Sequence, residues 1–282
     1  MVSEGSPHDP GDSPYRKQDP GRLSRRETVL VTGASSGIGL ELAHRFAASG
    51  SQLVLVARRV ERLDDLAAKL KDRFATRSLV RPTDLSEPGD RRSLLQELAS
   101  SGWEVDVLVN NAGFGLLGKA VDLDIRRQME MVEVNVSALT DLTLRLLPGM
   151  VTRRRGGILN VASTAAFQPG PRMAVYYATK AHVLSFTEAL AQELRGTGVV
   201  ATCLAPGPTE TDFRSKTGIK DAVLAHLGTM DPEQVARAGY RGFRKGRVVV
   251  VPGLLNRMGT FAVRLTPRGV ARKLVDLLHR KG

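Results

Sequence analysis

Two residues near the middle of the chain, Tyr176 and Lys180, have the types and the spacing that proton transfer needs. They lie four residues apart, so on a helix both side chains share one face, one turn apart. A free tyrosine has a pKa near ~10, which is too high for acid–base work at neutral pH, and a nearby ammonium group lowers that pKa by favouring the phenolate. The pair therefore predicts a tyrosine acid/base whose pKa is lowered by Lys180, although such pairs on helices are often only surface contacts.

A hydroxyl group thirteen residues before Tyr176, on Ser163, could hold the oxygen of a substrate. Reduction of a carbonyl group by hydride needs a proton donor for the developing alkoxide, and the reverse reaction needs a base for the alcohol. Ser163, Tyr176 and Lys180 together are suited to this chemistry.

A glycine-rich segment, 32-TGASSGIG, directly follows an apolar run and precedes a helical pattern. Gly33, Gly37 and Gly39 would permit a tight turn, a close approach of a pyrophosphate, and close packing of helix on strand. The N-terminus of the helix would offer N–H groups and a partial positive charge to the phosphates. The segment favours a dinucleotide site, and a tight turn with no ligand is the alternative.

The elements that must position these residues are predicted from seven short apolar runs, most of them separated by amphipathic segments of helical length. Such alternation demands right-handed crossovers and a parallel sheet. We expect an α/β fold: one Rossmann-like, doubly wound domain over residues 27–252, with a seven-stranded parallel sheet flanked by helices. The predicted strands span 28–33, 52–57, 78–83, 105–110, 157–163, 198–206 and 247–252, and the clearest helices span 38–49, 59–74, 126–150 and 175–196.

The ends of the chain differ from this domain in composition. Residues 1–26 are rich in Pro, Gly, Ser and charge and predict a disordered tail, whereas residues 253–282 predict a basic amphipathic helical extension. The 282 residues include one Cys, which excludes a disulfide framework and a multi-cysteine zinc site, and we expect no metal. The sequence shows neither an apolar run of about 18 residues nor an apolar leader, so we expect a cytoplasmic protein.

Over roughly residues 28–250, the sequence resembles the short-chain dehydrogenase/reductase family, because it has the motifs of that family in the same order. It looks most like the bacterial oxidoreductases of the family. The matching features are T-G-x-x-x-G-I-G at 32–39, 110-NNAG, Ser163, Y-x-x-x-K at 176–180 and 206-PGPTET. The resemblance implies an NAD(P)-dependent enzyme that acts on CH–OH groups. It assigns Tyr176 as general acid/base, Ser163 as the holder of the substrate oxygen, Lys180 as tyrosine modulator and ribose ligand, and Asn135 as the holder of a proton-relay water. Both offsets favour Tyr176 over the neighbouring Tyr177.

The resemblance also implies which residues bind the cofactor. Asp84 and Leu85 should flank the adenine ring, while Asn110 and Ala112 should meet the ribose through their backbone. The full implied set is Gly33, Ser35, Ser36, Gly37, Ile38, Gly39, Arg58, Asp84, Leu85, Asn110, Ala112, Gly113, Tyr176, Lys180, Pro206, Gly207, Thr209 and Thr211.

The end of the second apolar run bears on the choice between NADP(H) and NAD(H). An acidic residue there would bind both ribose hydroxyls of NAD, but the chain has Arg58 and Arg59. A guanidinium group grips a phosphate in a bidentate way, so we expect NADP(H), with Arg58 on the 2′-phosphate. Ser36 stands where a second basic residue is often found, and the alternative is that both arginines are only surface charges.

Substrate and partners are less constrained. Phe114, Leu116, Phe167 and Met173, with Phe213, Leu224 and Leu227 of the loop 208–230, predict an apolar site for a small carbonyl or alcohol. We expect a homo-oligomer, a dimer or tetramer, and no nucleic-acid partner, because the basic residues lack interleaved aromatic side chains. A non-catalytic dinucleotide-binding regulatory protein on the same fold is the alternative function.

The net charge of +12 is concentrated near the C-terminus. Residues 237–282 hold twelve Lys and Arg against one acid, Asp276, with leucines between them. We expect helices that cap the substrate side or form an oligomer face, which would bury Leu254, Phe261, Leu274 and Leu278. Peripheral contact with an anionic membrane is the alternative.

Overall fold

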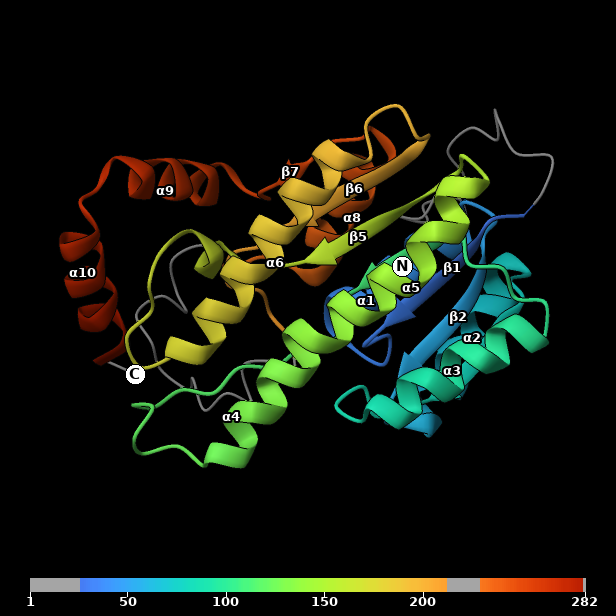
Figure 1. The fold of residues 1–282 in the computed structure, drawn as a ribbon, viewed down its shortest axis with the longest axis horizontal. Helices are drawn as coiled ribbons and strands as arrows, with labels where there is room; N and C mark the ends of the chain where they lie inside the picture. Colours follow the sequence, from blue (N-terminus) through green and yellow to red (C-terminus); the bar gives the residue numbers. More distant parts are fainter. Residues whose placement is uncertain (1–25, 212–228, 281–282) are drawn as a thin grey trace, which may run out of the picture.

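The computed structural model describes residues 26–211 and 229–280. Seven strands form one parallel sheet in the order β3-β2-β1-β4-β5-β6-β7 (Figure 1). The strands are β1 (Thr28–Thr32), β2 (Gln52–Ala57), β3 (Ser78–Pro82), β4 (Val107–Asn110), β5 (Gly156–Val161), β6 (Val199–Leu204) and β7 (Val249–Val250). The predicted seven-stranded, doubly wound fold is confirmed.

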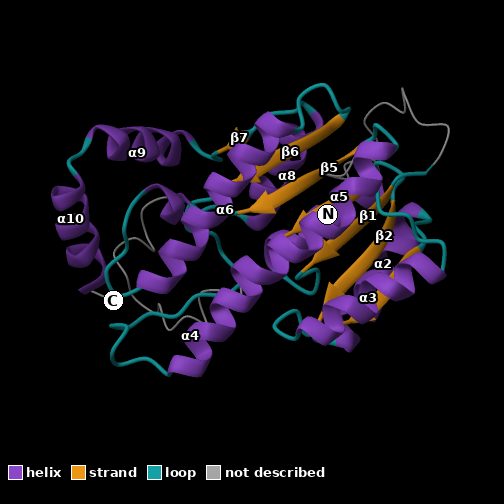
Figure 2. Cartoon of the chain, in the orientation of Figure 1, coloured by secondary structure: helices purple, strands orange, loops and turns teal. Residues whose placement is uncertain are grey.

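Helices cover both faces of the sheet (Figure 2). They are α1 (Gly37–Ala48), α2 (Val60–Phe74), α3 (Pro88–Ser100), α4 (Ile125–Val132), α5 (Leu139–Thr152), α6 (Ala174–Glu193) and α8 (Pro232–Arg244). Successive residues of a strand point to opposite faces, so Val29 and Val31 pack with α1, α2 and α8, whereas Leu30 packs with α3, α5 and α6. All three are fully buried, which explains why β1 reads as a continuous apolar run.

The segment predicted as one helix over 126–150 is helical throughout but is not uniform. Between α4 and α5 the chain forms a π-helical turn, η1 (Glu133–Ala138), which contains Asn135. Such turns are rare and occur frequently at functional sites. The hydrophobic pattern predicts the helix but carries no signal for this local change of winding.

All seven strands run in one direction, so their carboxyl ends meet at one edge of the sheet. The glycine turn follows β1, residues 111–113 follow β4, Ser163 follows β5, and residues 206–209 follow β6. The sheet order reverses at the β1–β4 pair, and ligands of open α/β sheets bind in the crevice at such a point. The topology therefore gathers the motifs that are separated in the sequence.

Two further helices, α9 (Leu254–Leu265) and α10 (Arg268–Arg280), form the predicted C-terminal extension at one end of the molecule (Figure 1). The expected burial of their apolar residues is wrong within the single chain. Leu254, Phe261 and Leu274 are 70%, 64% and 55% exposed, and Leu278 is half-buried. The buried residue of α9 is the polar Thr260, which lies on the side of the helix that faces the protein.

Several predictions concern residues that the structure does not describe. The predicted tail lies outside the described residues except for Arg26, and so do Phe213, Leu224 and Leu227. In the described ranges, no helix combines the length and the apolar character needed to cross a bilayer.

Candidate active site

The glycine turn between β1 and α1 has a different physical reason for each glycine. Gly33 and Gly37 have positive φ angles of 64° and 57°, which residues other than glycine rarely adopt. Gly39 sits within α1, where a Cβ atom would lie 2.4 Å from the carbonyl oxygen of Gly33. The first two shape the turn, and the third lets the helix pack against it.

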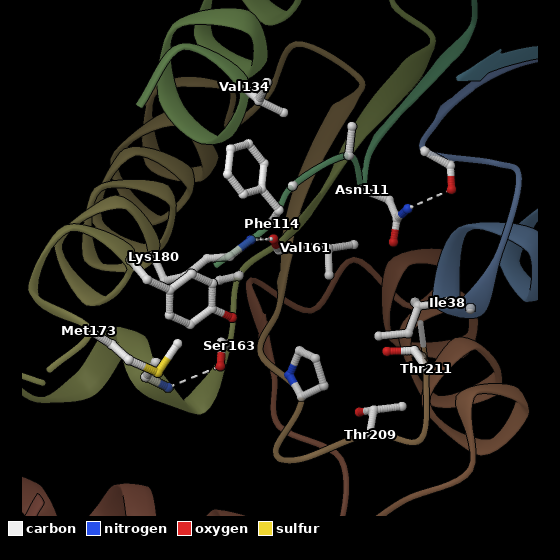
Figure 3. Close-up of a pocket in the computed structure, with 18 of the residues that line it drawn as sticks. Ile38, Asn111, Phe114, Val134, Val161, Ser163, Met173, Lys180, Thr209 and Thr211 are labelled. Carbon is white, nitrogen blue, oxygen red and sulfur yellow. Dashed lines mark hydrogen bonds between the residues drawn. The ribbon is translucent and has the colours of Figure 1, made fainter. Parts of the chain in front are cut away.

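Asn111 holds this turn from the neighbouring strand. Its Nδ2 donates to the carbonyl oxygens of Thr32 at 3.0 Å and Gly33 at 3.2 Å, and its side chain lies beside the turn in Figure 3. The hydroxyl of Thr32 in turn accepts hydrogen bonds from the backbone N–H groups of Asn111 and Ala112, at 3.0 Å each. Sequence reasoning missed Asn111, although the repeated asparagine in 110-NNAG was the available signal.

The start of α1 is suited to an anion. Its N-cap residue, Ser36, makes no hydrogen bond from its side chain to the first turn, so the backbone N–H groups there are open to a ligand. Arg59 lies next to this point, with Nη2 3.1 Å from both the Ser35 and the Ser36 hydroxyl oxygens. The neighbouring Arg58 is more exposed and faces Glu130 at 3.4 Å and Asp84 at 3.7 Å.

One cavity of about 710 Å³ runs along the carboxyl edge of the sheet. The described residues contain no cluster of His, Cys, Asp and Glu arranged to hold a metal ion. The predicted site residues that line the cavity are Gly33, Ser35, Ser36, Gly37, Ile38, Arg58, Asp84, Leu85, Ala112, Gly113, Ser163, Tyr176, Lys180, Pro206, Gly207, Thr209 and Thr211. Gly39, Asn110 and Asn135 do not line it.

The side chain of Asn110 belongs to the interior of the protein. Its Nδ2 donates to Asn160 Oδ1 at 2.9 Å and to Thr143 Oγ1 at 3.0 Å, and Asn160 continues the chain of hydrogen bonds to Thr187. This network joins β4 and β5 to α5 and α6. The backbone contact of Asn110 with a cofactor stays a prediction.

Asn135 also acts through its neighbours. Its buried amide Nδ2 donates to the carbonyl oxygen of Phe114 at 2.9 Å and to Thr179 Oγ1 at 3.1 Å, while its Oδ1 accepts from the backbone N–H of Phe114 at 3.1 Å. The side chain thus ties the loop after β4 to α6 and fixes Phe114 in the cavity wall. Its role in holding a relay water stays a prediction.

Ser163 and Tyr176 meet in this cavity. Ser163 precedes the short 3-10 helix η2 (Thr164–Phe167), and its Oγ accepts the N–H of Ala165 at 3.1 Å. Burial raises the pKa of Tyr176 to about 12, although a hydrogen bond with Ser163 opposes the rise. The tyrosine pKa therefore moves opposite to the direction that the sequence predicts.

Lys180 shows why. Its Nζ lies 5.9 Å from the centre of the Tyr176 ring and donates to the carbonyl oxygen of Val161 at 2.9 Å (Figure 3). Burial also lowers the pKa of Lys180 to about 8. Desolvation disfavours the charged form of both groups, and for the tyrosine it outweighs the hydrogen bond with Ser163.

The part of the cavity beyond Tyr176 is mostly apolar. Phe114 and Met173 line it as predicted, whereas Leu116 and Phe167 pack against neighbouring clusters and do not. Helix α10 also lines the cavity, with Val275, Leu278 and His279. This position agrees with the expectation that the C-terminal helices cap the substrate side, although the sequence did not single out Val275 or His279. The ring nitrogens of His279 lie 3.3 Å from the Tyr177 hydroxyl and 2.8 Å from the carbonyl oxygen of Pro171, which attaches α10 to the start of α6.

The arrangement joins the glycine turn at the start of α1, the phenol of Tyr176 and an apolar chamber in one cavity. The chain as a whole is similar to known proteins. Residues 27–222 match the family model described as short chain dehydrogenase. Sulfoacetaldehyde reductase 2 of Chromohalobacter salexigens is 39% identical over 217 residues, which are 74% of this chain and 85% of that protein.

Two solved structures are also similar. A short-chain dehydrogenase from Sphingobium yanoikuyae in complex with NADPH is 33% identical with a TM-score of 0.77, covering 86% of this chain and 94% of that one. The bulky-bulky ketone specific alcohol dehydrogenase from Comamonas testosteroni is 30% identical with a TM-score of 0.72, covering 85% and 93%. The chain belongs to the short-chain dehydrogenase/reductase family and is an oxidoreductase of alcohols and carbonyl compounds.

Proposed function

We propose that this enzyme reduces an apolar carbonyl compound to its alcohol, and catalyses the reverse reaction, with NADP(H) as cofactor and Tyr176 as general acid/base. The observation that carries the proposal is the position of Tyr176 and Ser163 in the same cavity as the glycine turn. When bound, the nicotinamide would supply or accept the hydride.

The protein's own groups account for the proton. With its pKa near 12, Tyr176 keeps its hydroxyl proton at neutral pH, so it is ready to donate that proton to a developing alkoxide. The hydroxyl of Ser163 lies beside it and would hold the same oxygen. Lys180, 5.9 Å from the ring centre, would stabilise the phenolate that remains.

The residues at the other end of the cavity fit a dinucleotide. A Cβ atom on Gly33 would lie 2.8 Å from Asn111 Nδ2, so the turn is held tightly and leaves its backbone exposed to the cavity. Together with the open N–H groups at the start of α1, it could bind the pyrophosphate.

The preference for NADP(H) is proposed from the cations beside this turn. Arg59 contacts the Ser35 and Ser36 hydroxyls, and Arg58 stands next to it at the cavity edge. The two guanidinium groups could share a 2′-phosphate, with Ser35 as a hydroxyl donor. Arg59 is proposed as the main ligand because its guanidinium group lies beside the turn, in contact with both hydroxyls, whereas that of Arg58 is turned toward Asp84 and Glu130.

The proposed substrate is an uncharged, bulky carbonyl compound. Phe114, Met173, Tyr177, Val275 and Leu278 give the chamber beyond Tyr176 an apolar wall. The resemblance to an alcohol dehydrogenase that is specific for bulky-bulky ketones supports the same class.

The test is an absorbance assay of the purified enzyme with NADPH or NADH and a panel of carbonyl compounds graded from small and charged to large and apolar. We expect oxidation of NADPH that is fastest with large apolar ketones or aldehydes. Tight binding of NADPH with no turnover of any carbonyl or alcohol would instead favour a regulatory protein, and faster turnover with NADH would overturn the proposed preference.

A further inference from the structure

Helices α9 and α10 expose more large apolar side chains than all the rest of the described chain. Each of these side chains is at least half exposed. They are Leu254, Leu255, Met258, Phe261 and Leu265 on α9, and Val270, Leu274 and Leu277 on α10. Single exposed leucines are common on protein surfaces, but many exposed apolar side chains gathered on two successive helices mark an interaction site. We call these eight residues the outer apolar surface.

Helix α9 has its apolar side turned away from the protein. Leu254, Met258, Phe261 and Leu265 follow one another at helical spacings of three and four, so they form one stripe. The opposite side contacts the body through Asn256, whose Nδ2 donates to the carbonyl oxygen of Pro252 at 2.9 Å, and through the buried Thr260. The amphipathic pattern is thus reversed relative to a helix that packs on its own core.

The outer apolar surface is accompanied by positive charge. Arg257 on α9, and Arg268, Arg272 and Lys273 at and after the start of α10, are all exposed, whereas the guanidinium group of Arg264 lies 6.0 Å from the centre of the Phe167 ring. The acid in these two helices, Asp276, forms an ion pair with Arg172 at 3.3 Å. The cations are therefore left to attract an anionic partner.

We infer that the outer apolar surface of α9 and α10 docks on an anionic lipid bilayer. A basic amphipathic helix lies in the plane of such a surface, with its apolar side among the acyl chains and its cations among the headgroups. This inference goes beyond the proposed function and does not depend on it.

Charge favours a lipid surface over a second copy of the chain. A two-fold symmetric dimer places the same patch of both subunits face to face. That contact would bring two sets of exposed cations together with no acid of α9 or α10 left to pair with them. Anionic headgroups supply the complementary charge at any position along the helices.

Because α10 also forms part of the cavity wall, docking by its outer side would fix the orientation of the cavity relative to the bilayer. The inner side of α10 lines the cavity with Val275, Leu278 and His279, while its outer side carries Leu274 and Leu277. The same helix thus separates the proposed lipid contact from the cavity. Docking by this surface would place the cavity wall directly above the bilayer.

The experiment is co-sedimentation of the full-length protein with vesicles, and it compares phosphatidylcholine alone with phosphatidylcholine that contains phosphatidylserine. We expect binding to the mixed vesicles at low salt and weak binding to the neutral ones. Added salt should weaken the binding, because charges at an exposed surface are screened beyond about 10 Å at 0.1 M.

Two sets of variants separate the apolar and the charged contributions. Leu255→Asp with Phe261→Asp should abolish sedimentation with mixed vesicles, whereas Val121→Asp with Ile125→Asp, at equally exposed apolar positions elsewhere, should leave it unchanged. Arg257→Gln, Arg268→Gln and Lys273→Gln together should weaken binding about 100-fold, since each cation near an anionic surface contributes about a fivefold factor. Lys69→Gln, Lys71→Gln and Arg92→Gln on α2 and α3 are the matched control.

Melting curves should show that all four variants fold, because every substituted side chain is exposed. Three results would overturn the inference. These are no binding to mixed vesicles at low salt, equal binding to neutral vesicles, and binding that the α9 and α10 variants do not change. Light scattering tests the alternative that the surface binds a second copy of the chain. If the protein is a dimer that does not bind vesicles, and Leu255→Asp with Phe261→Asp converts it to monomers, the surface serves self-association.

Discussion

At the scale of single residues, burial moves the two candidate catalytic groups in opposite directions. It raises the pKa of Tyr176 to about 12 and lowers the pKa of Lys180 to about 8. The tyrosine therefore keeps its proton throughout the neutral range, whereas the lysine loses its charge just above it. If Tyr176 is the proton donor, as we propose, carbonyl reduction should be fastest under neutral or mildly acidic conditions.

The first prediction is a pH profile. The kcat/KM for carbonyl reduction should be level below pH 7 and should fall as the pH passes about 8, because Lys180 loses the charge that stabilises the phenolate. Lys180→Arg keeps a cation at all these pH values and should move the fall to higher pH, at lower overall activity. An unchanged inflection near pH 8 in a folded Lys180→Arg variant would assign that titration to another group.

The second prediction concerns cofactor choice. Arg59→Ala should weaken NADPH binding by roughly 10- to 100-fold, since a hydrogen bond to a charged group contributes about 1.5–3 kcal/mol, and it should leave NADH binding nearly unchanged. Arg58→Ala should have a smaller effect, because Asp84 and Glu130 already face this guanidinium. Fluorescence titration measures the affinity of each of the two variants for NADPH and for NADH. The Arg62→Ala variant on α2 is the control. Equal losses for both cofactors would refute a role in reading the 2′-phosphate.

At the scale of elements, adjacent residues at the end of β4 serve different structures. The side chain of Asn110 points into the core and links two strands with two helices, whereas that of Asn111 holds the glycine turn. The alternation of side chains along a strand accounts for this difference. One motif therefore supports both the stability of the sheet and the shape of the site.

The third prediction separates these two roles. Asn110→Ala should lower the free energy of unfolding by about 1–3 kcal/mol, the cost of leaving a buried hydrogen-bonding group unsatisfied, with little change in NADPH affinity. Asn111→Ala should weaken NADPH binding more strongly, because the backbone of Gly33 loses its support. Denaturant unfolding and cofactor titration of both variants measure the two effects. A loss of affinity confined to Asn110→Ala would reverse the assignment.

The fourth prediction uses His44 on α1. Burial, with help from the charges of Arg73, Lys69 and Arg45, lowers its pKa from 6.5 to about 4. Between these values the unfolded chain binds a proton that the folded chain does not, so the stability that His44 contributes above pH 6.5 is lost as the pH falls toward 4.

His44→Gln removes this titration. The variant should match the wild type in stability at pH 7.5 and should lose less stability on acidification to pH 4.5, as measured by denaturant midpoints. Parallel losses in the two proteins would show that His44 does not titrate abnormally.

The sequence predicts local patterns well and tertiary contacts poorly. The strands and the glycine turn follow from runs and spacings within a few residues of each other. The contact of Arg59 with the Ser35 hydroxyl, and the placement of His279 against Tyr177, join segments far apart in the chain. An amphipathic pattern also shows that a helix has an apolar side without showing which side meets the protein, which is why the sequence does not predict that Phe261 is exposed in the single chain.

At the scale of the whole molecule, the cavity is assembled from two parts. The carboxyl edge of the sheet supplies the glycine turn and the catalytic candidates, and α10 supplies part of the wall of the apolar chamber. Arg172 and Asp276 join the two parts by an ion pair of 3.3 Å. We propose that the chemistry belongs to the first part, and that the second part sets the size and polarity of the substrate.

The central claim is that Tyr176 transfers the proton, and the substitution Tyr176→Phe tests it most directly because it removes only the hydroxyl group. Its matched control is Tyr177→Phe, which removes the hydroxyl of the adjacent tyrosine that bonds His279. Single-turnover reduction of the best carbonyl substrate should be measured for both variants, with NADPH affinity measured beside it.

We expect Tyr176→Phe to reduce the rate by at least about 10²-fold, as for loss of a general acid, with NADPH affinity retained. The loss for Tyr177→Phe should be much smaller. Comparable rates for the wild type and Tyr176→Phe, or a larger loss in Tyr177→Phe, would contradict the assignment of Tyr176 as the proton donor.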